Sequence, residues 1–173
     1  IGTIDSFLLH HLTGGAVLAC DATNAARTLL LDLDTLQWDP EIADALGVAL
    51  ELLPEVLPSG GDFGETVPFA SLAAGTPIRA VLGDSHAALF GQRCDSPGEG
   101  KVTFGTGSSV MVPTHGRTAS DSTVDTTLGY ALDRPTYARE GNILYSGAAL
   151  ETMAGILSLD GGSGVTRLAA TAS

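Results

Sequence analysis

The chain has 173 residues, of which 44% are hydrophobic and 16% charged, and its formal net charge is −12. This composition supplies a packed core and excludes a disordered chain, while the acidic balance argues against nucleic acid and anionic lipid as partners. No apolar run approaches the roughly 20 residues that cross a bilayer, and we expect neither a membrane span nor a signal peptide. Cys20 and Cys94 lack metal-ligand spacing, so we expect reduced thiols and a cytoplasmic protein.

The first third of the chain alternates between short helical and extended patterns. Apolar residues at helical spacing predict a helix over 4–12, and Gly14 with Gly15 would end it. Asp39 before Pro40 is typical of an N-cap followed by the first residue of a helix, here 40–46. The other elements expected in this part are a strand at 16–20, a capped turn at 21–24, extended chain at 29–33, a turn at 35–39 and a helical turn at 51–54.

The middle of the chain mixes a Pro- and Gly-rich stretch with one apolar run. Residues 56–66 predict a surface connection, and 68–74 predict a helix. The apolar run at 78–82 predicts a buried strand, and a helix is expected over 85–90. Residues 95–100 contain one Pro and two Gly, and they are the expected boundary between two subdomains.

Beyond this boundary the pattern favours strands and then helices. Two strands are expected on either side of a Gly-Thr-Gly turn, and a polar loop after them. The expected elements are strands at 101–104 and 108–113, a loop at 114–127, strands at 129–132 and 136–141, a helix at 147–157, a loop at 161–164 and a final helix.

The first candidate for a catalytic motif is Gly83-Asp84, which lies between the expected strand and the expected helix. Ligands of open α/β sheets bind where strands end, and the start of a helix favours an ionised carboxylate. An ionised Asp84 can accept the proton of an alcohol that attacks a phosphoryl group. Capping of the helix by Asp84 is the alternative role, and the two roles are compatible.

The second constellation is Gly105-Thr106-Gly107. A turn of this kind between two strands exposes backbone amides and a hydroxyl, which can hold phosphate oxygens without a charged side chain. A plain hairpin turn is the alternative, because glycines are ordinary there. The spacing is neither that of a Walker A loop nor that of a dinucleotide fingerprint.

The histidines offer weaker candidates. His86 lies two residues after Asp84, and it is either a structural histidine or a substrate contact. His10 and His11 lack a third ligand at metal spacing, so no metal site is expected there.

Taken together, these motifs resemble the FGGY family of carbohydrate kinases, and within it the glycerol kinase branch. The resemblance covers nearly the whole chain in order. It is carried by residues 2–9, 12–15, 21–28, 34–39, 52–56, 83–84, 87–92, 104–107, 137–141 and 147–149.

The resemblance implies an α/β fold of the actin, hexokinase and Hsp70 type (ribonuclease H-like), in which two domains close over a cleft and which is incomplete in this chain. Residues 1–94 would end the substrate-side N-terminal domain, and 95–173 would begin the nucleotide-side C-terminal domain. The implied cofactors are ATP and Mg²⁺, and the implied partner is a small sugar or polyol. A homo-oligomer is compatible with the sequence.

The resemblance also assigns site residues. Asp84 corresponds to the general base, with an indirect role toward the Mg²⁺ of Mg-ATP. Thr106, Gly107 and Gly147 correspond to nucleotide contacts. Glu151 stands where glycerol kinases usually carry a glutamine near the nucleotide.

Two positions depart from the glycerol kinase pattern. Ser85 stands where a glutamine usually contacts the polyol, and Ser109 where an aromatic residue usually packs against its carbons. Both remain expected substrate contacts, but the pocket is larger and more polar. This indicates glycerol or a related, larger polyol or ketose.

The leading hypothesis is therefore ATP-dependent phosphorylation of a polyol or sugar hydroxyl. The alternatives are a non-catalytic binding or regulatory member of the same fold, or an inactive fragment of it. A third hypothesis, an unrelated β-rich binding module, requires residues 101–141 to form a closed sheet without a neighbouring cleft. Since the family's N-terminal phosphate loop and its adenosine-binding segment are not in the sequence, we expect little activity from these residues alone.

Overall fold

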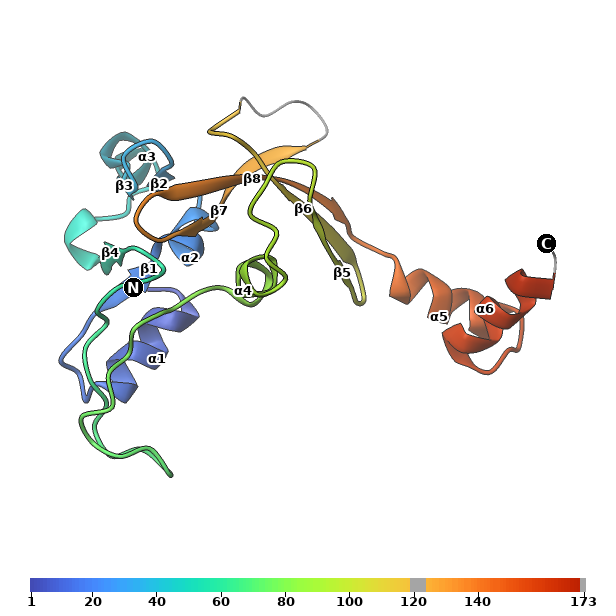
Figure 1. Ribbon diagram of the computed structural model, residues 1–173, viewed down its shortest axis with the longest axis horizontal. Helices are drawn as coiled ribbons and strands as arrows, with labels where there is room; N and C mark the ends of the chain where they lie inside the picture. Colours follow the sequence, from blue (N-terminus) through green and yellow to red (C-terminus); the bar gives the residue numbers. More distant parts are fainter. Residues whose placement is uncertain (119–123, 172–173) are drawn as a thin grey trace.

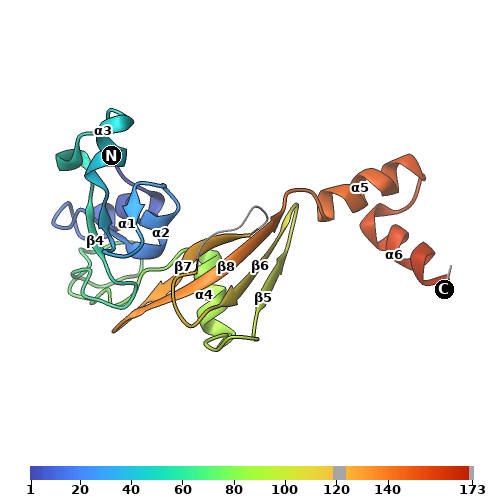
Figure 2. The same ribbon diagram turned by 90° about the horizontal axis from the view of Figure 1, so that it is seen from above.

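The computed structural model describes residues 1–118 and 124–171. The molecule is elongated, with the amino-terminal part at one end, a sheet in the middle and a pair of helices at the other end (Figures 1 and 2). The α-helices are α1 (Ile4–Leu12), α2 (Ala22–Ala26), α3 (Pro40–Ala45), α4 (Asp84–Gly91), α5 (Gly147–Ile156) and α6 (Gly161–Thr171), and a 3-10 turn covers Leu50–Leu52.

The strands of the described residues form two small pairs and one larger sheet. Strand β1 (Ala19–Asp21) pairs in parallel with β4 (Glu55–Leu57), and β2 (Leu31–Asp32) pairs antiparallel with β3 (Gln37–Trp38). The larger sheet is antiparallel, with the strand order β5-β6-β8-β7. Its strands are β5 (Lys101–Phe104), β6 (Ser108–Pro113), β7 (Asp125–Ala131) and β8 (Pro135–Ile143).

Local sequence chemistry explains the helix starts in the amino-terminal part. The Asp21 carboxylate accepts hydrogen bonds from the amides of Thr23 and Asn24 and thereby caps α2. The Asp39 carboxylate caps α3 in the same way, with Pro40 in the first turn. Both are the expected use of an aspartate side chain at an N-cap, and the prediction for 40–46 is confirmed.

Helix α4 packs against the larger sheet. Leu89 of α4 forms a buried cluster with Met111 of β6, Tyr130 of β7 and Ala138 of β8, and Cys94 completes it. This cluster joins both sides of the expected subdomain boundary, and the division into two domains at 94 and 95 stays a prediction. Both cysteines are free and buried, as expected.

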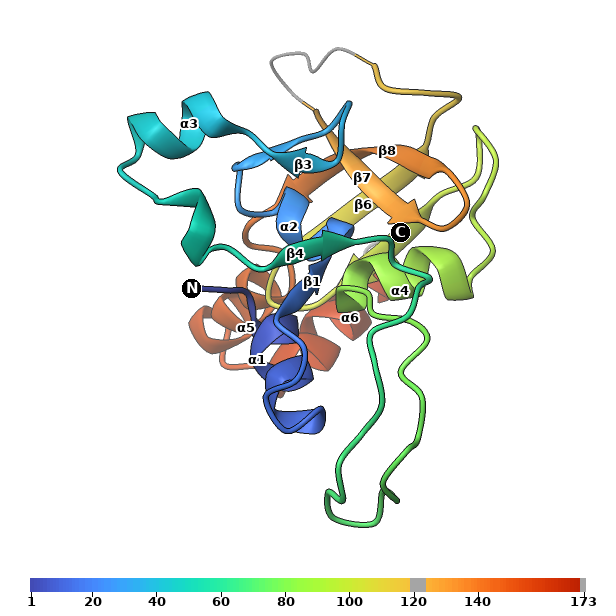
Figure 3. The same ribbon diagram turned by 90° about the vertical axis from the view of Figure 1, so that its left-hand side faces the viewer.

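The segment 59–81 differs most from the sequence-based expectations. Residues 78–82 are not a buried strand. They form one side of a ribbon that extends away from the body of the molecule, and the tip of this ribbon replaces the helix predicted at 68–74 (Figure 3). Backbone bonds such as Phe63 N to Ile78 O (3.0 Å) pair the two sides. The expected surface connection at 56–66 is only partly a surface segment, because it includes the last two residues of β4 and the fully buried side chains of Ser59 and Phe63.

The loop predicted at 161–164 is the first turn of α6. Glycines favour loops because of their flexibility, but here a contact from another helix stabilises the helical start. The Glu151 carboxylate of α5 accepts a hydrogen bond from the Gly162 amide (2.9 Å) and satisfies a donor at the end of α6. The loop predicted at 114–127 lies partly outside the described residues, and β7 begins within it at Asp125.

Candidate active site

Asp84 is the first residue of α4, so the predicted helix start is confirmed to within one residue, but the segment before it is not the strand that the sequence predicted. The N-cap position is Gly83, so Asp84 is not the capping residue. The Asp84 side chain is exposed, and its carboxylate accepts a hydrogen bond from the Ser85 amide (2.6 Å). The carboxylate therefore stands in the first turn of a helix, where the helix dipole favours negative charge, and it remains open to a ligand.

A buried network fixes the backbone immediately before Asp84. The Gly83 amide donates to Thr23 Oγ1 (3.3 Å), and this hydroxyl donates to the Asp21 carboxylate (2.7 Å). The Ser59 hydroxyl also donates to Asp21 (2.7 Å). Asp21 and Thr23 are completely buried. The sequence predicted a capped turn at 21–24, which is the capped start of α2, but not its reach to Gly83, since the two segments are about 60 residues apart.

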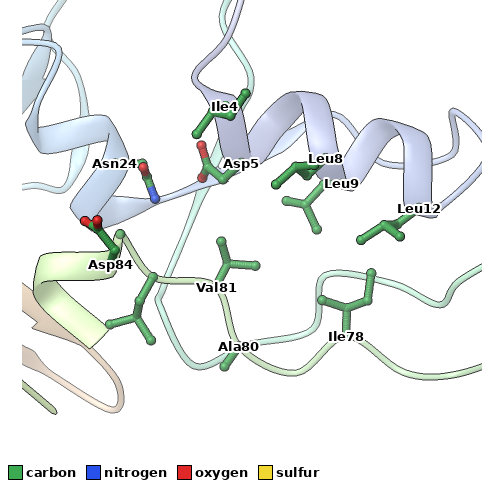
Figure 4. Close-up of a pocket in the computed structure, with 12 residues that line it drawn as sticks. Ile4, Asp5, Leu8, Leu9, Leu12, Asn24, Ile78, Ala80, Val81 and Asp84 are labelled. Atoms are coloured by element: carbon green, nitrogen blue, oxygen red, sulfur yellow. The ribbon is translucent and has the colours of Figure 1, made fainter. Parts of the chain in front are cut away.

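Asp84 lies at the polar end of a cavity of about 640 Å³. Asp5 of α1 and Asn24 of α2 line the same end, and Figure 4 shows the three polar side chains grouped there. The remaining wall is mostly apolar and comes from α1 and from the extended segment before Asp84: Ile4, Leu8, Leu9, Leu12, Ile78, Ala80, Val81 and Leu82. Such a cavity suits a small molecule with hydroxyl groups at one end and carbon atoms along its length.

The Gly105-Thr106-Gly107 turn joins β5 to β6 and is therefore a hairpin turn. Two properties distinguish it from a plain hairpin turn: its free amides and a close backbone approach. The amides of Thr106 and Gly107 have no hydrogen-bond acceptor within the described ranges 1–118 and 124–171. A Cβ atom on Gly107 would lie 2.6 Å from the Ile143 carbonyl oxygen. Glycine is therefore required at 107 by a close backbone approach, and the free amides can bind an anion.

The start of α5 contacts this turn. The Gly147 amide donates to the Gly105 carbonyl (3.1 Å), and the Ala148 amide donates to the Thr106 carbonyl (3.1 Å). A Cβ atom on Gly147 would lie 2.3 Å from the Gly105 oxygen, so no side chain fits. The structure thus brings Thr106, Gly107 and Gly147 together, with a helix N-terminus beside them.

Glu151 lies one turn further along α5 and is exposed. Its carboxylate is engaged with Gly162 of α6, as described above. Its contact with a nucleotide stays a prediction.

Ser85 and Ser109 are joined by a residue that the sequence analysis did not single out. Lys101 is only 1% exposed, and its ammonium group donates to the hydroxyls of Ser85, Thr103 (2.8 Å) and Ser109 (3.5 Å). Burial lowers the pKa of Lys101, and the charges of Glu140 and Asp84 partly oppose this shift. The signal in the sequence that could have identified this residue is a lysine at the start of a predicted strand.

A second hollow, of about 450 Å³, lies beside the Gly105–Gly107 turn. Ser109 faces this hollow rather than the cavity beside Asp84. Arg27 at the end of α2 also lines it, and its guanidinium group is paired with the carboxylate of Glu140. The second hollow therefore has a mixed polar and apolar lining, and one cation lines it.

His86 is buried, and neither ring nitrogen has a hydrogen-bond partner among the described residues. This contradicts the interpretation of a satisfied structural histidine. Burial lowers the pKa of His86 below 6.5, with Asp21 acting in the opposite direction and Arg27 in the same one.

The lowered pKa of His86 predicts a loss of stability in acid. Below about pH 6.5 the unfolded chain binds a proton that the folded chain refuses, so the free energy of unfolding falls with falling pH. In the full-length protein, His86→Gln should weaken this dependence, seen as a smaller difference in Tm between pH 7.5 and 5.5. The control is His115→Gln, at an exposed position. An equal pH dependence in wild type and His86→Gln would contradict the prediction.

Within residues 1–118 and 124–171, no group of three or more His, Cys, Asp or Glu side chains could hold a metal ion. An indirect role of Asp84 toward Mg²⁺ thus stays a prediction. In the same residues, none of the helices has the length and apolar character that a membrane crossing requires.

Solved structures of sugar and polyol kinases share the architecture of this chain. A Plasmodium falciparum glycerol kinase with ADP superposes with a TM-score of 0.85 and 32% identity, over 94% of this chain and 33% of its own. A xylulose kinase from Rhodospirillum rubrum superposes with a TM-score of 0.75 at 20% identity, over 89% of this chain and 31% of its own. The fold is therefore the actin and hexokinase-like fold of these kinases, and the β-rich module is excluded.

The sequence comparisons give the family. The description "FGGY family of carbohydrate kinases, N-terminal domain" matches residues 1–91. The glycerol kinase of Thermus brockianus is 50% identical over 151 residues, which cover 86% of this chain and 30% of that protein. The chain belongs to the FGGY family of carbohydrate kinases, and it spans about 30% of the length of the curated relatives it matches.

Proposed function

We propose that the protein containing this chain transfers the γ-phosphoryl group of ATP to a hydroxyl of a polyol or sugar, with Asp84 as the general base. The observation that carries the proposal is the exposed Asp84 carboxylate at the polar end of a cavity of about 640 Å³. The similarity to glycerol kinases, one of them solved with ADP, supports ATP as the donor.

Each group of site residues has a separate role in the proposed phosphoryl transfer. Asp84 accepts the proton of the attacking hydroxyl, which Asp5 and Asn24 help to orient. The amides of Thr106 and Gly107, with the start of α5 at Gly147, hold phosphate oxygens. ATP with Mg²⁺ supplies an activated phosphoryl group whose charge the ion partly neutralises.

The choice of acceptor follows from two short side chains. Ser85 and Ser109 are short side chains at positions where the glycerol kinase pattern has a glutamine and an aromatic ring. Neither lines the cavity beside Asp84, but both hydroxyls accept a hydrogen bond from Lys101, and Ser85 directly follows Asp84. We infer that the acceptor is a polyol or ketose larger than glycerol.

The test is a screen of the full-length protein for ADP release with ATP and a series of polyols and ketoses. We expect kcat/KM for a larger acceptor to exceed that for glycerol. The double variant Ser85→Gln, Ser109→Phe should shift this ratio toward glycerol by about 30-fold or more, since two contacts at about 1–3 kcal/mol of discrimination each add to at least about 2 kcal/mol.

Ser71→Gln, at an exposed position on the ribbon, is the matched control. An unchanged ratio in the double variant would contradict the inferred acceptor. Binding of acceptor and nucleotide without ADP release would instead favour the non-catalytic alternative.

A further inference from the structure

Two of the few cations of this acidic chain lie at the second hollow. The sequence holds 8 Lys and Arg against 20 Asp and Glu, yet Arg27 lines the hollow and Lys101 lies directly behind it. Glu140 and Asp84 offset part of this charge, so the case for an anionic ligand rests on the hydrogen-bond donors that the hollow presents.

The register of the larger sheet produces the floor of this hollow. Thr103 of β5 pairs with Ser109 of β6, and Ser109 pairs with Asn142 of β8. All three side chains line the hollow. Lys101 stands two residues before Thr103, so both side chains lie on the same face of the sheet. The floor is thus a row of polar side chains with an ammonium group beside it.

Lys101 determines which way the hydroxyls of this floor donate. An ammonium group only donates hydrogen bonds, whereas a hydroxyl has one donor and two acceptor sites. Thr103 and Ser109 accept from Lys101, so the hydrogen atom of each hydroxyl remains for a ligand. Together with the amides of Thr106 and Gly107 they offer donors to an anion.

Arg27 adds a guanidinium group to the lining of the hollow. Its side chain is about half exposed, while its partner Glu140 is only 7% exposed. The ion pair fixes the guanidinium group, and a guanidinium has five N–H donors, so donors remain for a ligand.

We propose that the second hollow binds the phosphoryl group in transfer, with Arg27 as a catalytic residue that contacts it and Lys101 as a positioning residue that acts through Thr103 and Ser109. The inference rests on the proposed function. In the step, the acceptor oxygen bonds to phosphorus while the bond from phosphorus to the bridging oxygen of the nucleotide breaks. Asp84 takes the acceptor proton, the electron pair leaves with ADP, and Arg27 stays charged throughout.

The experiment compares Arg27→Gln, Arg27→Lys and Glu140→Gln in the full-length protein, with Tm, kcat and KM for ATP and for the acceptor as readouts. Arg27→Gln should lower kcat by roughly 10²–10³, the loss typical of a removed transition-state donor. Arg27→Lys should recover part of it. Glu140→Gln breaks the ion pair but keeps the Arg27 cation. Its loss of kcat should therefore be at least tenfold smaller than that of Arg27→Gln, although the two variants lose a comparable amount of Tm. The control is Arg79→Gln, in an exposed pair with Asp62.

Lys101 is tested by a double-mutant cycle with Lys101→Met and Ser109→Ala. If Lys101 acts through the hydroxyl of Ser109, the two losses of kcat should not multiply in the double variant. Fully multiplicative losses would overturn its positioning role.

Four results would overturn the role of Arg27. Equal losses of kcat in Glu140→Gln and Arg27→Gln would reduce Arg27 to a structural partner of Glu140. A change confined to the KM of the acceptor would assign the hollow to an anionic acceptor. If the wild type turns over and Arg27→Gln stays within about threefold of it, the inference alone fails. If the wild type transfers no phosphoryl group to any acceptor, the proposed function fails and the inference with it.

Discussion

Replacing Asp84 with asparagine should lower kcat of the full-length protein by roughly 10²–10⁴, the usual contribution of a general base. Asparagine has nearly the same shape as aspartate, but its amide cannot take the proton of the attacking hydroxyl. Asp84 is exposed and is not the N-cap of α4, so the substitution should leave the fold unchanged. The measurement is kcat with the preferred acceptor, together with Tm and the affinity for ATP.

The control for this variant is Asp62→Asn, an equally conservative change on the exposed ribbon. It should leave both kcat and Tm near the wild-type values. Turnover of Asp84→Asn within a few-fold of the wild type would refute the base assignment. The retained Tm distinguishes loss of chemistry from loss of structure.

The sequence predicted the elements whose signals are local. The helix at 40–46 follows from Asp39 and Pro40, because the capping bonds form within three residues. The hairpin of β5 and β6 follows from two apolar runs around three turn residues. The helix predicted at 85–90 corresponds to α4, which begins one residue earlier at Asp84, where a Gly-Asp pair interrupts an apolar run.

The errors arose where distant parts of the chain decide the structure. Residues 78–82 are as apolar as a buried strand, but their backbone partners are residues 59–64, and both sides belong to a projecting ribbon. Residues 161–164 have the composition of a loop, but Glu151 supplies an acceptor to the start of α6. Neither partner can be identified from the local pattern.

The candidate site shows the same division. Asp84 and the Gly105–Gly107 turn stand out because each is a local motif. Lys101, Arg27 and the Asp21 network do not, because their partners lie on other elements: Ser85 and Ser109 for Lys101, Glu140 for Arg27, and Ser59 for Asp21. Neither the burial of Asp21 nor its contact with Ser59 can be predicted from the polar residues next to it in the sequence.

The Asp21 network leads to the second large effect, which concerns stability. Asp21→Ala removes the acceptor of the amides and side chains of Thr23 and Asn24 and of the Ser59 hydroxyl. Asp21 is fully buried, and each buried donor left without an acceptor costs about 1–3 kcal/mol. After partial relaxation we expect a loss of about 3 kcal/mol in the free energy of unfolding, measured as a clear fall in Tm of the full-length protein.

The chain offers a matched control in Asp39. This aspartate caps α3 with the same pair of amide bonds, but these bonds are exposed, so Asp39→Ala should cost only about 1 kcal/mol. Because Asp21 also supports the backbone of Gly83 through Thr23, Asp21→Ala should lower kcat below the unfolding transition, whereas Asp39→Ala should not. If both variants lose the same Tm and keep the same kcat, Asp21 is an ordinary helix cap, and the positioning of Asp84 must come from elsewhere in the fold.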